Sequence, residues 1–114
     1  SGREVAHPGE RVVSARPARI AAALVRLGDG FEVSLEERTG VFQLAAPERA
    51  LTFLSSAEFE AANRPVWEIT VPFDDETAES DEIDWNGMTL TVLRAVDVRI
   101  GGETVVRTLI AAVT

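Results

Sequence analysis

Two runs of alternating apolar and polar residues, followed or preceded by short turns, constrain most strongly how this chain can fold. The first run covers residues 67–73, and the second begins at Met88, directly after Asn86-Gly87. Successive side chains of a β-strand point to opposite faces of the sheet, so each run predicts a strand with one buried face. An Asn-Gly pair between alternating runs is a strong hairpin signal. The second half of the chain therefore predicts antiparallel β-structure.

The second run continues to a Gly-Gly pair at residues 101–102, which predicts another hairpin. A three-residue loop at 101–103 would place Asp97 opposite Arg107, whereas a two-residue loop would place Arg107 on the apolar face. We prefer the three-residue loop, because it keeps the charge away from the core. The last run, 104–113, is apolar on both faces, which is typical of a central strand or of one covered by a partner.

The first half of the chain predicts one helix and one strand. Residues 17–27 carry an apolar face at helical spacing, with Pro17 suited to the first turn and Gly28 to the position just past the end. The strict alternation of residues 31–36 predicts a strand in which Leu35 faces the core. These two elements are expected to pack against the antiparallel half.

The segment between them and the first long run is less regular. Residues 39–40 predict a turn, residues 41–44 a short strand or an irregular connection, and residues 50–54 a further strand. Ser55 is followed three residues later by Glu58, which fits a capping box and predicts a second short helix directly after Ser55.

The length of 114 residues fits one domain. Residues 1–16 are expected to form an N-terminal arm, because they hold several Gly and Pro residues and little periodicity. Residues 17–114 are expected to form a single domain. The predicted fold is mainly β: a small antiparallel barrel or sheet with one N-terminal helix, a long loop and a second short helix.

The composition excludes several classes of function. The formal net charge of −8 argues against ordinary nucleic-acid binding, which needs clustered cations, and against an anionic membrane surface as partner. The chain has no Cys, which excludes a disulfide framework and a thiolate metal site. The lack of Lys excludes Schiff-base chemistry and a P-loop lysine. No apolar run is long enough to cross a bilayer. We therefore expect no cofactor and no membrane association.

The stretch FDDETAESDEIDWNG, residues 73–87, is the most acidic part of the chain. Its carboxylates belong to Asp74, Asp75, Glu76, Glu79, Asp81, Glu82 and Asp84. A calcium loop of the EF-hand type needs a central Gly, and no Gly lies between residues 75 and 86. A pair of catalytic carboxylates has no support beyond the abundance of acidic residues. The stretch therefore predicts no metal site. It predicts a solvated, mobile loop, which repulsion between its carboxylates holds out from the barrel.

Three other residues are candidates for chemistry or for contacts. His7 is the only His and lies in the arm, far in the sequence from any candidate nucleophile. It therefore predicts no catalytic site. Trp85 flanks the Asn-Gly turn and suits either the core or an interface. Arg94 falls on an otherwise apolar strand face, so either a bulge turns it outward or it pairs with an acid across an interface.

The run from Ser80 to Val96, SDEIDWNGMTLTVLRAV, combines acidic residues, a turn ending in Gly and an alternating strand. Together with the strands on either side, residues 66–113, it resembles the head–tail connector family of long-tailed phages and related gene-transfer particles. These are the head-closure or stopper proteins of the viral neck. Residues 39–64 depart from the family's simple strands, which leaves open whether the chain is a stopper or a tail-completion protein.

The resemblance implies a structural protein of the virion neck, assembled in the host cytoplasm and without enzymatic activity. Its subunits would form a homo-oligomeric ring between the portal or adaptor and the tail, and DNA would pass through the centre. The loop of residues 73–83 would project into that channel, where acidic groups would repel phosphates and let the duplex slide. The channel residues implied are Asp74, Asp75, Glu76, Glu79, Asp81 and Glu82.

The resemblance also suggests subunit contacts, which the N-terminal arm with His7 and Arg11 would suit, as would Arg94 and Trp85. A different interpretation of the same residues is a small acidic β-barrel adaptor that binds a basic protein partner through the loop. A small hydrolase or metal-dependent enzyme is the third interpretation, and the absence of Cys, Lys and a framed His argues against it.

Overall fold

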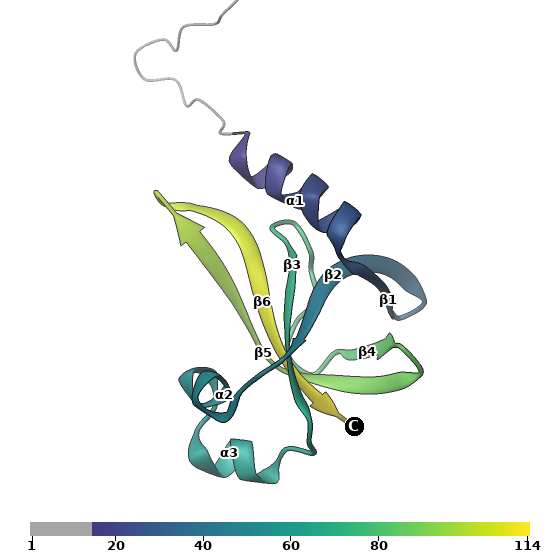
Figure 1. The fold of residues 1–114 in the computed structure, drawn as a ribbon, viewed down its shortest axis with the longest axis vertical. Coiled ribbons are helices and arrows are strands. Elements are labelled where there is room, and N and C mark those ends of the chain that lie inside the picture. Colours follow the sequence, from purple (N-terminus) through teal and green to yellow (C-terminus); the bar gives the residue numbers. More distant parts are fainter. Residues whose placement is uncertain (1–14) are drawn as a thin grey trace, which may run out of the picture.

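The computed structural model describes residues 15–114 and is mainly β. The strands are β1 (Asp29–Val33), β2 (Glu36–Leu44), β3 (Val66–Pro72), β4 (Glu82–Trp85), β5 (Met88–Ile100) and β6 (Glu103–Val113). The helices are α1 (Arg16–Leu27), α2 (Pro47–Phe53) and α3 (Ser56–Ala61). The strands close a barrel in the order β1-β2-β3-β6-β5-β4, and every neighbouring pair is antiparallel (Figure 1). The predicted fold class is confirmed.

The helix predicted at residues 17–27 is α1, which contacts β2, β3 and β6. Pro17 is buried in its first turn, and Gly28 is the C-cap, with its N–H donating to the carbonyl oxygen of Leu24 at 2.7 Å. A Cβ atom at Gly28 would lie 2.6 Å from the carbonyl oxygen of Gly40 in β2. Glycine therefore lets the end of α1 approach the barrel closely.

The barrel interior is the main core, and a second core lies outside the barrel wall. The interior cluster is Phe31, Val33, Ile69, Val71, Ile83, Leu90, Val92, Leu109 and Ala111. The second cluster joins the wall to α2 and its neighbour α3, and contains Ala50, Leu54, Val66, Ile110 and Ala112. The two-sided apolar pattern of β6 follows from this, because Leu109 faces the interior and Ile110 faces the helices. Of the two alternatives for residues 104–113, a central strand is confirmed, because β6 lies between β3 and β5.

The prediction that Leu35 faces the core is wrong. Residues 34–35 form the turn between β1 and β2, with φ of +53° at Ser34 and +68° at Leu35, and Leu35 is 88% exposed. The turn lacks the Gly or Asn that commonly marks this left-handed conformation. The turn predicted at residues 39–40 is also wrong, because both residues lie inside β2, where Gly40 is buried beside Ile69.

The strand predicted at residues 50–54 is wrong as well, because most of this segment belongs to α2. Pro47 starts that helix, and Ala50 and Leu54, four residues apart, are buried on the same side. The capping box that follows is confirmed: Ser55 Oγ accepts from the Glu58 N–H at 3.1 Å, and the Ser55 N–H donates to Glu58 Oε1 at 2.9 Å.

The Asn86-Gly87 hairpin is confirmed, with Trp85 paired to Met88 and positive φ at both turn residues. The loop after β5 has two residues, since Ile100 pairs with Glu103, so the prediction of a three-residue loop is wrong. The predicted pairing of Asp97 with Arg107 nevertheless holds, because an irregularity between Val98 and Arg99 leaves one extra residue on β6. The bulge therefore gives β5 and β6 the same register at Asp97 and Arg107 that a three-residue loop would have given.

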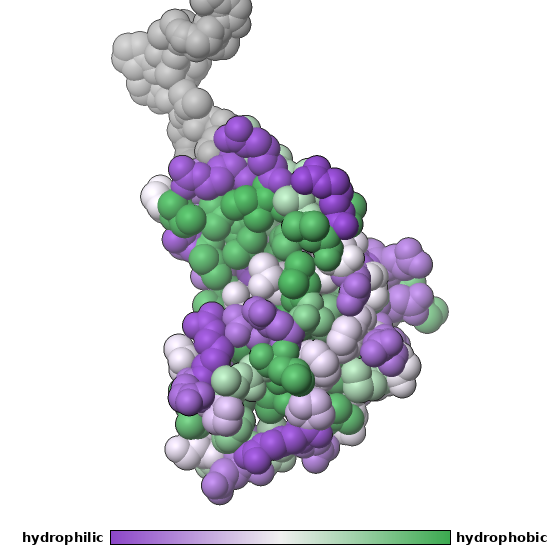
Figure 2. Space-filling view, in the orientation of Figure 1, coloured by the Kyte–Doolittle hydropathy of each residue, from purple (hydrophilic) through white to green (hydrophobic). Residues whose placement is uncertain are grey.

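The β5–β6 hairpin extends beyond the barrel as a two-stranded ribbon, which rises to the upper left of Figure 1. Figure 2 shows hydrophobic surface below α1, in the region of this ribbon. Residues 1–14 lie outside the described part of the chain, and so do His7, Arg11 and nearly all of the predicted arm. Within residues 15–114, none of the helices is long and apolar enough to span a bilayer.

Candidate functional site

The acidic loop, defined here as residues 73–81 between β3 and β4, has a specific internal structure. The Asp75 N–H donates to the Pro72 carbonyl oxygen at 3.1 Å, and Asp75 Oδ1 accepts from the Thr77 N–H at 2.8 Å. Asp81 Oδ2 accepts from the Ala78 N–H at 2.8 Å. An Asp side chain that accepts from the backbone two residues later is a common way to stabilise a turn. Two of the acidic side chains therefore shape the loop.

Arg38 of β2 binds the loop from one side. Its Nη1 lies 2.8 Å from Thr77 Oγ1 and 3.3 Å from Asp75 Oδ1, while its Nε lies 2.9 Å from Glu36 Oε1. Burial lowers the pKa of Arg38, but the hydrogen bond to Glu36 and the charge of Asp75 outweigh this effect and raise the pKa above its ordinary value. The guanidinium therefore stays charged where it holds the loop.

Arg107 of β6 binds the backbone of the same segment. Its Nη1 donates to the carbonyl oxygens of Asp75 and Thr77, at 2.8 Å for Thr77, and its Nε donates to Asp97 Oδ1 at 2.9 Å. The side chains of Arg38 and Arg107 are 19% and 15% exposed, so the contacts are shielded from water. Thr77, which lies between them, is fully buried.

The structure thus separates the acidic side chains into two groups. Asp75 and Asp81 are partly buried and used in hydrogen bonds of the loop. The exposed group contains Asp74, Glu76, Glu79, Glu82 and Asp84. The prediction of a loop held out from the barrel is wrong for its middle, because Arg38 and Arg107 fold that part onto the barrel. The prediction that the loop presents negative charge holds for the exposed group.

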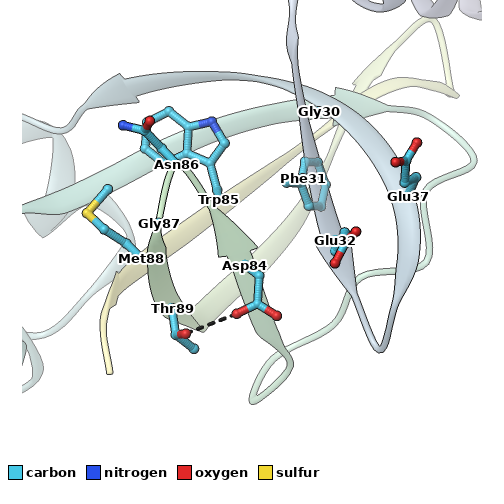
Figure 3. Close-up of a pocket in the computed structure, with 10 residues that line it drawn as sticks. All are labelled: Gly30, Phe31, Glu32, Glu37, Asp84, Trp85, Asn86, Gly87, Met88 and Thr89. Atoms are coloured by element: carbon cyan, nitrogen blue, oxygen red, sulfur yellow. Dashed lines mark hydrogen bonds between the residues drawn. The ribbon is translucent and has the colours of Figure 1, made fainter.

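The end of the acidic stretch lies in β4, where Ile83 points into the core and Glu82 and Asp84 point outward. Asp84 accepts a hydrogen bond from Thr89 Oγ1 at 2.9 Å (Figure 3). Only one residue pair, Glu32 with Asp84, joins β4 to β1. The barrel is therefore closed between β1 and β4 by a short stretch of strand pairing.

A pocket of about 470 Å³ lies beside that connection. It is lined by carboxylates from three strands and by the aromatic residue of β4: Glu32, Glu37, Asp84 and Trp85 are among its residues (Figure 3). A smaller pocket of about 270 Å³ brings Glu36 next to Asp74 and Glu76 of the acidic loop. The β1–β2 hairpin thereby extends the negative surface of the loop.

Within residues 15–114, no group of three or more His, Asp or Glu side chains is arranged to hold a metal ion. The acidic side chains are spread over the loop and three strands. The summed negative charge of such a surface attracts cationic groups and repels phosphates.

Arg94 is explained within the chain. Between Val92 and Arg94 the register of β5 shifts at a bulge, which confirms the first of the two alternatives considered for this residue. Arg94 Nη2 lies 2.7 and 2.6 Å from the carboxylate oxygens of Glu58 in α3. Hydrogen bonds from the Ser55 N–H and from Arg94 hold the pKa of Glu58 below its ordinary value. A role of Arg94 in a subunit contact stays a prediction.

Trp85 belongs to an aromatic cluster against the core. Its ring stacks on Phe42 with centroids 3.9 Å apart, and it meets Trp67 edge-on at 4.9 Å. Trp85 is partly buried there, so the core alternative accounts for its position. Its participation in an interface likewise stays a prediction.

The sequence interpretation missed Arg38 and Arg107 as the residues that hold the loop, and Glu32 and Glu37 as part of the acidic surface. The pairing of Arg107 with Asp97 was predicted, but not its contact with a segment some thirty residues earlier. Arg38 was missed because a turn was predicted at residues 39–40. In the structure β2 continues through these residues, so that Arg38 lies within a strand.

Comparisons with protein-family models, with curated proteins and with solved structures found no match to this chain.

Proposed function

We propose that this chain is a structural neck protein of a phage or phage-like particle, which forms a ring between the portal or adaptor and the tail. DNA passes through the ring, and the acidic loop faces the channel. The protein acts by assembly and not by catalysis. The proposal begins from the resemblance of residues 66–113 to head–tail connectors and rests further on the structure of the loop.

The observation that carries the proposal is the fixation of the loop by Arg38 and Arg107. A channel residue that must repel DNA is useful only if it cannot fold away from the duplex or be drawn into a contact. The two arginines direct their charges to Asp75, Thr77 and the loop backbone. Asp74 and Glu76 remain exposed on either side of Asp75. This arrangement supports a rigid, negatively charged surface.

Negative charge at a DNA channel has a clear physical effect. A protein that binds DNA gains affinity by neutralising phosphates with Lys and Arg and releasing counterions. Exposed carboxylates do the opposite, so a duplex can move past them without being retained. The net charge of −8 is consistent with that role and not with a DNA grip.

The test is a pair of matched variants in particles that carry this chain. E76Q/E82Q removes two exposed charges of the acidic stretch, whereas E48Q/E60Q removes two exposed charges from α2 and α3. We expect E76Q/E82Q to fold normally but to lower DNA delivery or tail joining, and we expect E48Q/E60Q to resemble the parent. Equal particle yield and DNA delivery for both variants would count against the channel role.

A second candidate function is an adaptor that binds a basic protein segment. The specific observation in its favour is the pocket whose lining includes Glu32, Glu37 and Asp84 from three neighbouring strands (Figure 3). Neighbouring carboxylates suit an Arg or Lys side chain. Titration with an Arg-rich peptide distinguishes the two functions: saturable binding that E37Q/D84N abolishes supports the adaptor, and salt-sensitive binding without a defined site does not.

A further inference from the structure

Within residues 15–114, about half of β5 is a sheet edge with no strand on its outer side. On its barrel side β5 pairs with β4 only from Met88 to Thr91, and Ser80 and Asp81 continue the contact to Val92. From Arg94 to Ile100, β5 pairs with β6 alone among the residues that the structure describes. Figure 1 shows this part of β5 at the outer left of the molecule, with β6 on its inner side and no strand on its outer side.

This edge is unusually apolar for a strand that faces water. Residues 96–100 are all exposed, and Val96, Val98 and Ile100 alternate on one face at 38%, 37% and 49% exposure. Figure 2 shows hydrophobic surface in this region. A long, exposed and apolar edge strand is a template for pairing with another strand, and proteins normally protect such edges with charges, Pro or a covering segment.

The charges on the other face identify the partner. Asp97 and Arg99 are the two residues between the apolar ones, and they carry opposite charges. If a second β5 pairs antiparallel about a two-fold axis at Val98, Asp97 of each copy lies opposite Arg99 of the other. On the other face, Val98 then meets its own counterpart, and Val96 meets Ile100. The segment is complementary to itself on both faces.

The other registers are disfavoured by the same residues. A shift of one residue places apolar side chains opposite charged ones. A shift of two residues places Asp97 opposite Asp97 or Arg99 opposite Arg99, and a parallel pair with the same residues side by side does the same. Like charges directly opposite each other on a sheet are destabilising. Only the antiparallel register centred on Val98 pairs both charges and keeps the apolar residues together.

We propose that the free edge of β5 binds a second copy of this chain through antiparallel pairing of residues 96–100, centred on Val98. The contact joins the two β5–β6 ribbons into a four-stranded sheet and places Val96, Val98 and Ile100 of the two copies side by side on one face. It is isologous, whereas neighbours in a ring are related by the rotation of that ring. The β5 contact is therefore separate from any contact that closes a ring, and it does not depend on the proposed neck function.

Single cysteines in the full chain test the register, because the chain has no Cys of its own. Directly opposite residues of an antiparallel pair have Cα atoms about 4.5–5.5 Å apart, which suits a disulfide. V98C should therefore form a disulfide-linked dimer under mild oxidation. V96C alone and I100C alone should not, since four residues separate the two equivalent positions by roughly 13 Å. A mixture of V96C and I100C should cross-link as a heterodimer.

The cross-linking result can overturn the proposal directly. Equal cross-linking of V98C, V96C and I100C would indicate random collision, and absence of the V98C dimer would exclude the register. The mixture provides the internal control, because it succeeds only if position 96 of one copy meets position 100 of the other.

Sedimentation equilibrium of R99D and R19D tests the charges without cysteine. Arg99 and Arg19 are both exposed, and R19D makes the same charge change on α1, away from the edge. R99D places a carboxylate opposite Asp97 at both of the equivalent positions in the dimer. The like charges should weaken dimerisation about tenfold. R19D should leave the dimerisation constant unchanged. An unchanged constant in R99D, or an equal loss in both variants, would contradict the pairing.

Discussion

Arg107 in the last strand donates from Nη1 to the carbonyl oxygen of Thr77, at 2.8 Å, and so fastens the middle of the acidic loop to the barrel. The two residues are far apart in the sequence, and the loop between β3 and β4 has no strand pairing of its own at this point. The same guanidinium also donates from Nε to Asp97 Oδ1 on β5, at 2.9 Å. The position of the loop therefore depends on this partly buried side chain of β6 together with Arg38 of β2.

Replacement of Arg107 by Met should destabilise the protein and release the loop. The substitution leaves the carbonyl oxygens of Asp75 and Thr77 without their donor and Asp97 without its partner, at a cost of about 2 kcal/mol in the free energy of unfolding. Urea denaturation measures the loss, and hydrogen exchange of residues 73–81 should accelerate. R19M is the control, since Arg19 is exposed on α1 and its replacement should change either quantity little.

The hydroxyl of Thr77 should matter although it lies in a loop. Thr77→Val keeps the shape of this fully buried side chain but removes the acceptor for Arg38 Nη1. An unsatisfied, partly buried donor costs about 1–3 kcal/mol. T89V removes an exposed hydroxyl that binds Asp84 and should cost less than about 0.5 kcal/mol. Similar midpoints of thermal unfolding for the two variants would contradict the buried role of Thr77.

Glu58 should make stability sensitive to acid. Its pKa is lowered in the folded state by the Ser55 N–H and by Arg94, so its contribution is complete above the unfolded-state pKa and is lost as the pH falls through the folded-state pKa. Glu58→Gln keeps a capping side chain but removes the charge, and should flatten the fall in stability over that acidic range. Urea midpoints over a pH series measure the effect, with E60Q of the same helix as the control.

Gly28 and Gly30, two residues apart, should respond differently to alanine. A Cβ at Gly28 would lie 2.6 Å from the Gly40 carbonyl oxygen, whereas a Cβ at Gly30 would have nothing nearer than 3.9 Å. Gly28→Ala should therefore cost about 1–3 kcal/mol, because α1 or β2 must move. Gly30→Ala should be neutral or slightly stabilising, because a strand glycine loses more entropy on folding. Equal effects in thermal denaturation would show that α1 does not depend on this contact.

The sequence was sufficient where one strong local signal decides the structure. Asn86-Gly87 determined a hairpin, and Ser55 with Glu58 determined the start of a helix. It was insufficient where tertiary contacts outweigh local pattern. Leu35 continues an alternation but lies in a turn, and residues 50–54 look like a strand but form a helix whose Ala50 and Leu54 pack on the barrel wall.

The candidate site shows the same limit. The sequence predicted a long acidic loop after residue 73, which is correct for residues 73–81, whereas residues 82–85 form the unpredicted strand β4. It did not predict which acidic residues are structural, because the residues that bind Asp75 and Thr77 come from β2 and β6. No spacing rule within the loop carries that information, since it depends on which strands the closed barrel places beside the loop.

Electron microscopy of the purified full chain, over a wide range of protein concentration and with charge-neutral loop variants alongside, tests the neck proposal most directly. The proposal predicts closed rings whose central opening admits duplex DNA, with residues 74–82 lining that opening. A chain that forms only monomers or two-fold dimers at every concentration, or rings with the acidic loop on the outer rim, would contradict it.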